Sequence, residues 1–211
     1  MAAQLPSKAK PKHDERRRSF LLRRLWRDRK AASIIEFGLL TPIFFGVLGA
    51  SVDLGEAVLT KFKLSSTLEA ASSYALDQVQ IANKNQTTPP ASSAGGAAFA
   101  SSLAQLAANA IGSNWANVTV VVNNGPTTRI SGGTATNSGT ASNADNYYCP
   151  TGSGASIDWN SPQTTAGVAC SGGGVAGKFV RITVRRAYSP ILLPSPMVAQ
   201  DLSATSIIQV Q

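Results

Sequence analysis

The sequence contains few charged residues, two cysteines and a single histidine. Charged residues make up 14% of its 211 residues, against roughly 25% in ordinary soluble domains. A structural zinc site usually takes four cysteine or histidine ligands, and the chain offers only His13, Cys149 and Cys170. No histidine follows residue 13, so a later domain cannot hold a histidine-based catalytic triad. There is also no P-loop, GxSxG or HExxH motif. We therefore expect no cofactor, no metal and no enzymatic activity.

The positive charge is concentrated at the start of the chain. Residues 1–30 hold eleven of the nineteen Lys and Arg and three of the eleven acidic residues, so their net charge of +8 equals that of the whole chain. Residues 31–211 are therefore neutral overall. A DNA-binding domain would carry its positive charge on a folded face. This distribution is instead typical of a tail that meets nucleic acid or acidic lipid, or that sets membrane topology.

A hydrophobic run follows the basic tail. Residues 34–52 read IIEFGLLTPIFFGVLGASV, with no charge between Phe37 and Val52. Nineteen helical residues span about 28 Å, close to the ~30 Å hydrocarbon core of a bilayer. The positive-inside rule then places the N-terminus in the cytoplasm and residues 60–211 outside. A cleaved signal peptide, with a small-residue site near residues 49–51, is an alternative. A buried soluble helix would leave the basic block unexplained.

One acidic residue lies within this run. A carboxylate such as that of Glu36 costs roughly 2.5–3.5 kcal/mol at mid-bilayer and less near the interface. Glu36 either reaches the cytoplasmic headgroups or pairs with a cation on a neighbouring subunit. The residue pattern alone leaves both open.

The helical pattern continues beyond the hydrophobic run. Apolar residues recur at three- and four-residue steps from Leu54 to Val79, and no glycine or proline interrupts residues 56–83. We predict one long helix over about 33–82, with a membrane half (33–53) and an amphipathic half (54–88 including its end). Pro42 removes one helical hydrogen bond and is a candidate kink.

Residues 89–211 read as a small α+β domain. We predict a linker at 89–101, a short helix from Phe99 to Gly112, and strands at 117–122, near 127–131, at 178–187 and at 202–210. Residues 123–177 are rich in Gly, Ser, Thr and Asn, so we expect a poorly packed loop insertion there. The predicted fold is a long N-terminal helix followed by a small antiparallel-sheet domain with this insertion.

The junction between the basic tail and the hydrophobic run carries a family resemblance. Residues 29–42 read RKAASIIEFGLLTP, in which basic and then small or apolar residues precede Glu36-Phe37 and an apolar run containing Pro42. This segment resembles the N-terminal signature of the TadE-like family, pseudopilin-like proteins of tight-adherence (Flp) pilus machines within the type IV pilus superfamily. Residues 180–194 and the alternating C-terminal strand are similar to the family's tail, whereas the glycine-rich middle does not align.

The resemblance implies roles for several residues. A prepilin peptidase would cut between Ala31 and Ala32, although Ala31 stands where processed members usually have glycine. Glu36 would then be the fifth mature residue and would neutralise the N-terminal amine of a neighbouring subunit. Helix packing in the bilayer would use Pro42 and the small residues that allow close approach, Gly38, Gly46 and Gly49.

Cys149 and Cys170 lie 21 positions apart in the predicted insertion. If residues 60–211 lie in the periplasm, that compartment favours a disulfide, worth roughly 3–4 kcal/mol in the chain-entropy model. Two unpaired thiols are the alternative.

Other motifs carry less information. Residues 172–177 match GxGxxG but lack the flanking strand and helix of a nucleotide site. Arg181, Arg185 and Arg186 either form a basic face or line a solvated strand edge. Trp115 and Trp159 are expected to be local anchors.

These observations favour a non-enzymatic, single-pass component of the bacterial inner membrane, with a cytoplasmic N-terminus and a periplasmic domain. Its partners would be other pilin-like subunits, the inner-membrane platform of the pilus, membrane lipid and a prepilin peptidase, but not nucleic acid. The alternative is a membrane-anchored periplasmic binding or adhesion module.

Overall fold

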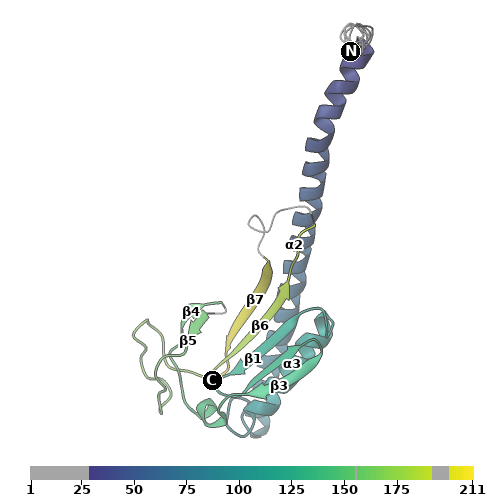
Figure 1. The fold of residues 1–211 in the computed structure, drawn as a ribbon. Coiled ribbons are helices and arrows are strands. Elements are labelled where there is room, and N and C mark those ends of the chain that lie inside the picture. Colours follow the sequence, from purple (N-terminus) through teal and green to yellow (C-terminus); the bar gives the residue numbers. More distant parts are fainter. Residues whose placement is uncertain (1–28, 155, 192–199) are drawn as a thin grey trace, which may run out of the picture. The chain divides into compact units, whose positions relative to one another are not determined.

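The structure is a computed structural model that describes residues 29–154, 156–191 and 200–211. The chain divides into two units, residues 1–51 and 52–211, and Figure 1 shows the fold of the described residues. The first unit is described only from Arg29 onward, where it is helical. Most of the predicted basic tail, residues 1–28, lies outside the described residues.

Helix α2 (Arg29–Asn85) is the longest element, with 57 residues and Pro42 inside it. Its length agrees with the absence of glycine and proline from residues 56–85. Beyond the helix, Gln86 adopts a left-handed conformation with φ of 52°. The Thr87 amide donates to the Ala82 carbonyl at 3.1 Å, which satisfies one carbonyl of the last turn. The predicted long helix is confirmed.

A five-stranded antiparallel sheet forms the centre of the second unit. Its strands are β1 (Asn117–Val122), β2 (Thr127–Ser131), β3 (Thr134–Ser138), β6 (Phe179–Ala187) and β7 (Asp201–Gln209). Their order across the sheet is β3-β2-β1-β6-β7. β6 therefore lies between β1 and β7, so interpreting Arg181, Arg185 and Arg186 as residues of a strand edge was wrong.

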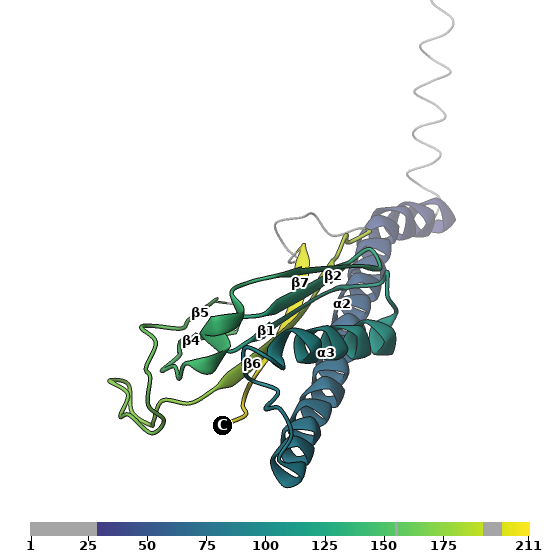
Figure 2. The same ribbon diagram turned by 90° about the horizontal axis from the view of Figure 1, so that it is seen from below.

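One face of this sheet is buried under two helices. Helix α3 (Gly96–Ile111) contacts β1 and β2. The part of α2 beyond residue 60 approaches β7, where the hydroxyls of Ser72 and Ser206 lie 2.9 Å apart. Figure 2 shows α3 and this part of α2 on the same side of the sheet. The core between them includes Leu64, Ala71, Leu103, Ala104, Val118, Val120, Val180, Ile182 and Val184. The predicted α+β fold is confirmed.

The predicted insertion contains more structure than expected. Residues 123–177 include β2, β3, the 3₁₀ helix η1 (Ala141–Asp145), and a separate hairpin of β4 (Thr151–Ser153) and β5 (Ser156–Asp158). Asn123, Ala144 and Tyr148 are buried, whereas most described residues of 149–175 are exposed or half-buried. Poor packing was therefore the wrong prediction for the first half of the segment. The predicted linker 89–101 was also too long, because α3 begins at Gly96.

Candidate functional site

The first half of α2 is long and apolar enough to cross a membrane, judged by length and composition. Its most apolar window has a mean hydropathy of 1.8 and is 6% buried. The large apolar side chains between Ile34 and Leu48 are each 47 to 75% exposed. A helix that is apolar around its whole circumference and exposed suits a lipid environment. The structure therefore contains one candidate membrane-spanning helix near the N-terminus of the chain.

The residues predicted to act in the membrane all lie on α2. They are Ala31, Ala32, Glu36, Gly38, Pro42, Gly46 and Gly49. Glu36 is exposed between Ile35 and Phe37. A methyl group added at Gly38 or Gly46 would meet no atom within 4 Å. These glycines therefore leave room beside the helix for a close neighbour.

Two hydroxyls in this segment are satisfied by the helix itself. Thr41 Oγ1 donates to the Phe37 carbonyl at 2.6 Å, and Ser51 Oγ donates to the Val47 carbonyl at 2.8 Å. Such bonds to the preceding turn remove the cost of placing a hydroxyl in hydrocarbon. The polar residues Thr41 and Ser51 are therefore compatible with a membrane span.

An exposed apolar stripe continues along α2 in the second unit. Leu54, Val58, Leu59 and Phe62 are 47 to 68% exposed. Some of them line a hollow of about 290 Å³ beside Leu202 of β7. The predicted amphipathic half thus has one apolar face on the sheet, from Leu64 onward, and a second that is exposed. Leu54, the first residue of the predicted apolar series, lies on the exposed face.

Asp53 connects α2 to the segment that follows β6. Its side chain is 1% exposed, and its Oδ1 accepts a hydrogen bond of 3.0 Å from the Ile191 amide. Its backbone carbonyl accepts a 2.7 Å bond from the Tyr188 hydroxyl. Burial, followed by the charges of Asp53 and Glu56, raises the pKa of Tyr188 above its usual value. The phenol therefore stays protonated and keeps donating at physiological pH. In the sequence, Asp53 reads only as a charge bordering the hydrophobic run.

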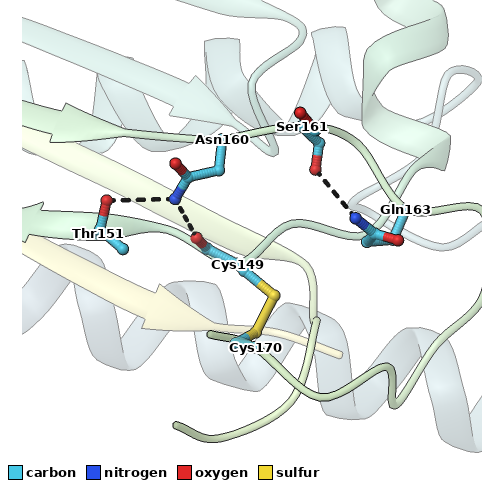
Figure 3. Close-up of a disulfide and its surroundings, with 6 residues drawn as sticks. All are labelled: Cys149, Thr151, Asn160, Ser161, Gln163 and Cys170. Carbon is cyan, nitrogen blue, oxygen red and sulfur yellow. Dashed lines mark hydrogen bonds between the residues drawn. A yellow bond between two sulfur atoms is a disulfide. The ribbon is translucent and has the colours of Figure 1, made fainter. Parts of the chain in front are cut away.

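The predicted disulfide is present. Cys149 and Cys170 are bonded, with their Cα atoms 5.6 Å apart. Asn160 Nδ2 donates to the Cys149 carbonyl at 2.6 Å and to Thr151 Oγ1 at 3.2 Å, as Figure 3 shows. The side chain of Asn160 therefore holds the two flanks of the β4–β5 hairpin together next to the bridge.

The two predicted aromatic anchors have different neighbours. The rings of Trp159 and Tyr148 meet edge-on, with centroids 5.7 Å apart. The guanidinium of Arg186 lies 4.0 Å from the Trp115 ring, and Lys63 of α2 approaches the same ring. Both contacts are attractive cation–π interactions, so they stabilise the Trp115 side chain in its observed position.

Asn123 is a structurally important residue that the sequence alone did not identify. It is fully buried and left-handed, with φ of 49°. Its Nδ2 donates to the carbonyls of Ala144 at 3.0 Å and Asn146 at 2.6 Å. Its Oδ1 accepts a bond of 3.2 Å from the Phe179 amide. This one side chain therefore ties the start of the insertion to the interior strand β6.

The three clustered arginines of β6 do not share a face. Alternation along the strand places Arg181 and Arg185 on the face away from the helices, whereas Arg186 lies on the other face with Trp115. Arg129 of β2 joins Arg181 and Arg185 in lining a groove on the uncovered face. The predicted basic face thus exists with a different third member.

No group of three or more His, Cys, Asp or Glu side chains that could hold a metal ion occurs within residues 29–154, 156–191 and 200–211.

Comparison of the chain with protein-family models, with curated proteins and with solved structures found no match.

Proposed function

We propose that the protein is a structural, pseudopilin-like component of a tight-adherence (Flp, type IV-like) pilus assembly or secretion machine. It acts by helix packing and subunit contacts and carries out no catalysis. The main support for the proposal comes from helix α2. One uninterrupted helix contains an exposed apolar segment preceded by basic residues and then supplies Leu64, Leu68 and Ala71 to the core of the second unit. The resemblance of residues 29–42 to the TadE-like signature also supports the proposal.

In this proposal the segment 33–53 spans the bacterial inner membrane, with the N-terminus in the cytoplasm. The second unit then lies in the periplasm. The Cys149–Cys170 bond supports this side of the membrane, because disulfides persist in oxidising compartments and are rare in the cytosol.

Subunit packing would occur along α2. In lipid, helices associate through close packing and polar contacts, since the bilayer removes the hydrophobic driving force between them. Gly38 and Gly46 supply the space, and Glu36 supplies a charge that pairs with a cation of a neighbouring subunit. The exposed stripe from Leu54 to Phe62 extends the packing surface past the span.

The proposal is tested by replacing Glu36 with Gln. The variant should insert into membranes as the wild type does, measured by resistance to carbonate extraction. It should lose co-purification with pilin-like subunits and the inner-membrane platform. Glu56→Gln is the matched control, because Glu56 is exposed on the same helix but lies past the span. Assembly that survives Glu36→Gln would overturn the role of Glu36 and favour the membrane-anchored binding module.

Processing is tested separately by N-terminal sequencing of the membrane-extracted protein. A prepilin peptidase would leave Ala32 as the first residue. Signal-peptide removal would leave a start near residues 49–51, and an uncut anchor would retain residues 1–31.

A further inference from the structure

The face of the sheet opposite the helices carries a groove of about 510 Å³ that is lined mainly by polar and charged residues. Residues with odd numbers along β6 point to this face, as the alternating burial of the strand shows. The groove is lined by arginine, threonine, serine, asparagine and aspartate side chains from β1, β2, β6 and β7, with Ala187 as its one apolar residue among the described lining. None of these described lining residues is aromatic.

Strand register places three arginines around two threonines. Arg129 on β2 is paired with Thr119 on β1, and Thr119 is paired with Thr183 on β6. Arg181 and Arg185 lie two positions to either side of Thr183 on the same strand. Neighbouring strands are about 4.8 Å apart and residues rise about 3.3 Å each. The three guanidinium groups thus border one area, with the two hydroxyls between them.

The groove has an excess of positive charge. Asp201 is the one acidic residue of its described lining, and it pairs with Arg185 at 2.5 Å. Three arginines and one aspartate leave a charge of +2 on a face of a unit whose chain segment 31–211 is neutral overall. Partial burial lowers the pKa of Arg181, and an arginine guanidinium is still protonated at physiological pH. The attraction of an anion to Arg181 is strengthened by the same burial.

The disulfide loop borders one end of this face. Phe179 and Gln209 lie next along the same face, and together with Cys149, Cys170 and the glycines after it they line a neighbouring hollow of about 410 Å³. The groove is therefore bounded at the Phe179 end by the insertion, and continues across the strands towards Asn117 and Ser203.

We propose that this groove binds an acidic polysaccharide, through carboxylates held by Arg129, Arg181 and Arg185 and sugar hydroxyls held by the threonine and serine side chains. Guanidinium groups bind carboxylates through paired, charge-assisted hydrogen bonds. An open groove on a sheet face admits a polymer from the side. An acidic peptide fits less well, because peptide docking relies on apolar pockets for anchor side chains. This inference does not depend on the pilus proposal.

The test is titration of the full chain in neutral detergent micelles with a short oligomer of galacturonic acid. Arg129→Gln and Arg181→Gln should each weaken binding about tenfold or more, as expected for loss of a charge-assisted pair. Arg186→Gln is the matched control, because it removes the same charge from the opposite face of β6. The basic residues 1–30 are the same in all variants, so any polyanion binding by them cancels when the variants are compared. Thr119→Val tests the hydroxyl contribution and should weaken binding without changing the urea midpoint.

Three outcomes would overturn the proposal. One is equal binding by the wild type, Arg129→Gln and Arg181→Gln. Another is an Arg186→Gln variant as weak as the groove variants. The third is an equally charged glutamate oligomer that binds more tightly than the sugar acid, which would assign the groove to acidic peptides. The methyl ester of the oligomer should not bind, since it keeps the sugar but loses the carboxylates.

Discussion

Removal of the Asn123 side chain should destabilise the second unit by about 3 kcal/mol. The buried side chain of Asn123 makes three hydrogen bonds, a buried one to Ala144 and two partly buried ones to Asn146 and Phe179. Each such bond contributes about 1 kcal/mol net. Asn123→Gly keeps the left-handed conformation, because glycine adopts φ of 49° without strain. The loss therefore reports the side chain and not the backbone.

The neighbouring residue provides a close control. Asn124 is left-handed with φ of 55°, and it contributes its backbone carbonyl, which accepts a 3.0 Å bond from Asn143 Nδ2. Asn124→Gly keeps that carbonyl. Both glycine variants carry the same gain of entropy in the unfolded chain, of about 0.4–1 kcal/mol. Subtracting one loss of stability from the other cancels this contribution.

Asn123→Asp should be worse than Asn123→Gly at neutral pH. A carboxylate would face the carbonyl oxygens of Ala144 and Asn146 and could donate to neither, which places an uncompensated charge in the interior. At acidic pH the carboxyl is protonated and can donate to one of them. The deficit relative to wild type should therefore shrink as the pH falls and grow as it rises.

Urea unfolding of the full chain in detergent, followed by tryptophan fluorescence, measures these differences, because Trp115 and Trp159 lie in the second unit while Trp26 is common to all variants. The expected order of stability at pH 7 is wild type, Asn124→Gly, Asn123→Gly and Asn123→Asp. Equal losses in the two glycine variants would refute the reasoning, because they would show that the Asn123 side chain does not hold the insertion to the sheet.

Two further predictions concern the disulfide and the surface ion pair. Replacing Cys149 and Cys170 with serine should lower the free energy of unfolding by about 3 kcal/mol, given a sequence separation of 21. Thiol titration of the unreduced protein should find both residues unreactive, and two reactive thiols would contradict the bridge. Hydrogen bonding to Arg185 lowers the pKa of Asp201, so its stabilising effect is present above the usual Asp range of about 4 and lost as the pH falls below it. The stability difference between wild type and Asp201→Asn should follow this course, and added salt should reduce it; a difference that grows in acid would contradict the pairing.

Most regular elements could be predicted from hydrophobic periodicity. The alternation in residues 179–187 places Val180, Ile182 and Val184 on one face, which is the face that the helices bury. Strand β3 carries no such signal, because all five of its side chains are exposed and none is large and apolar. Its pairing with β2 depends on the backbone, on the Gly132–Gly133 turn and on polar contacts such as the hydrogen bond from Thr128 Oγ1 to Asn137 Oδ1. β4 and β5 are too short, at three residues each, to show a period.

The contacts that organise the candidate sites join distant parts of the chain. Asp53 meets Tyr188 and Ile191 over more than 130 positions, and one sequence contains no record of such a pairing. Strand direction and strand pairing likewise determine which arginines lie on the groove face. Arg186 is adjacent to Arg185 in sequence yet lies on the opposite face, while Arg129 reaches the groove through pairing of β2 with β1.

The hydrogen bonds at Asp53 also provide one point where a mechanical load on α2 would reach the sheet of the second unit. Tension on α2 is passed at residue 53 to Tyr188 and Ile191, directly after β6. β6 is paired with β1 over residues 180–185 and with β7 over residues 179–187, so a pull at this point acts on an interior strand and loads two ladders at once. A pull delivered to the outer strand β3 would open a single ladder, one bond after another. The contact at Asp53 therefore carries part of the load to an interior strand, in addition to the contact of α2 with β7 at Ser72 and Ser206.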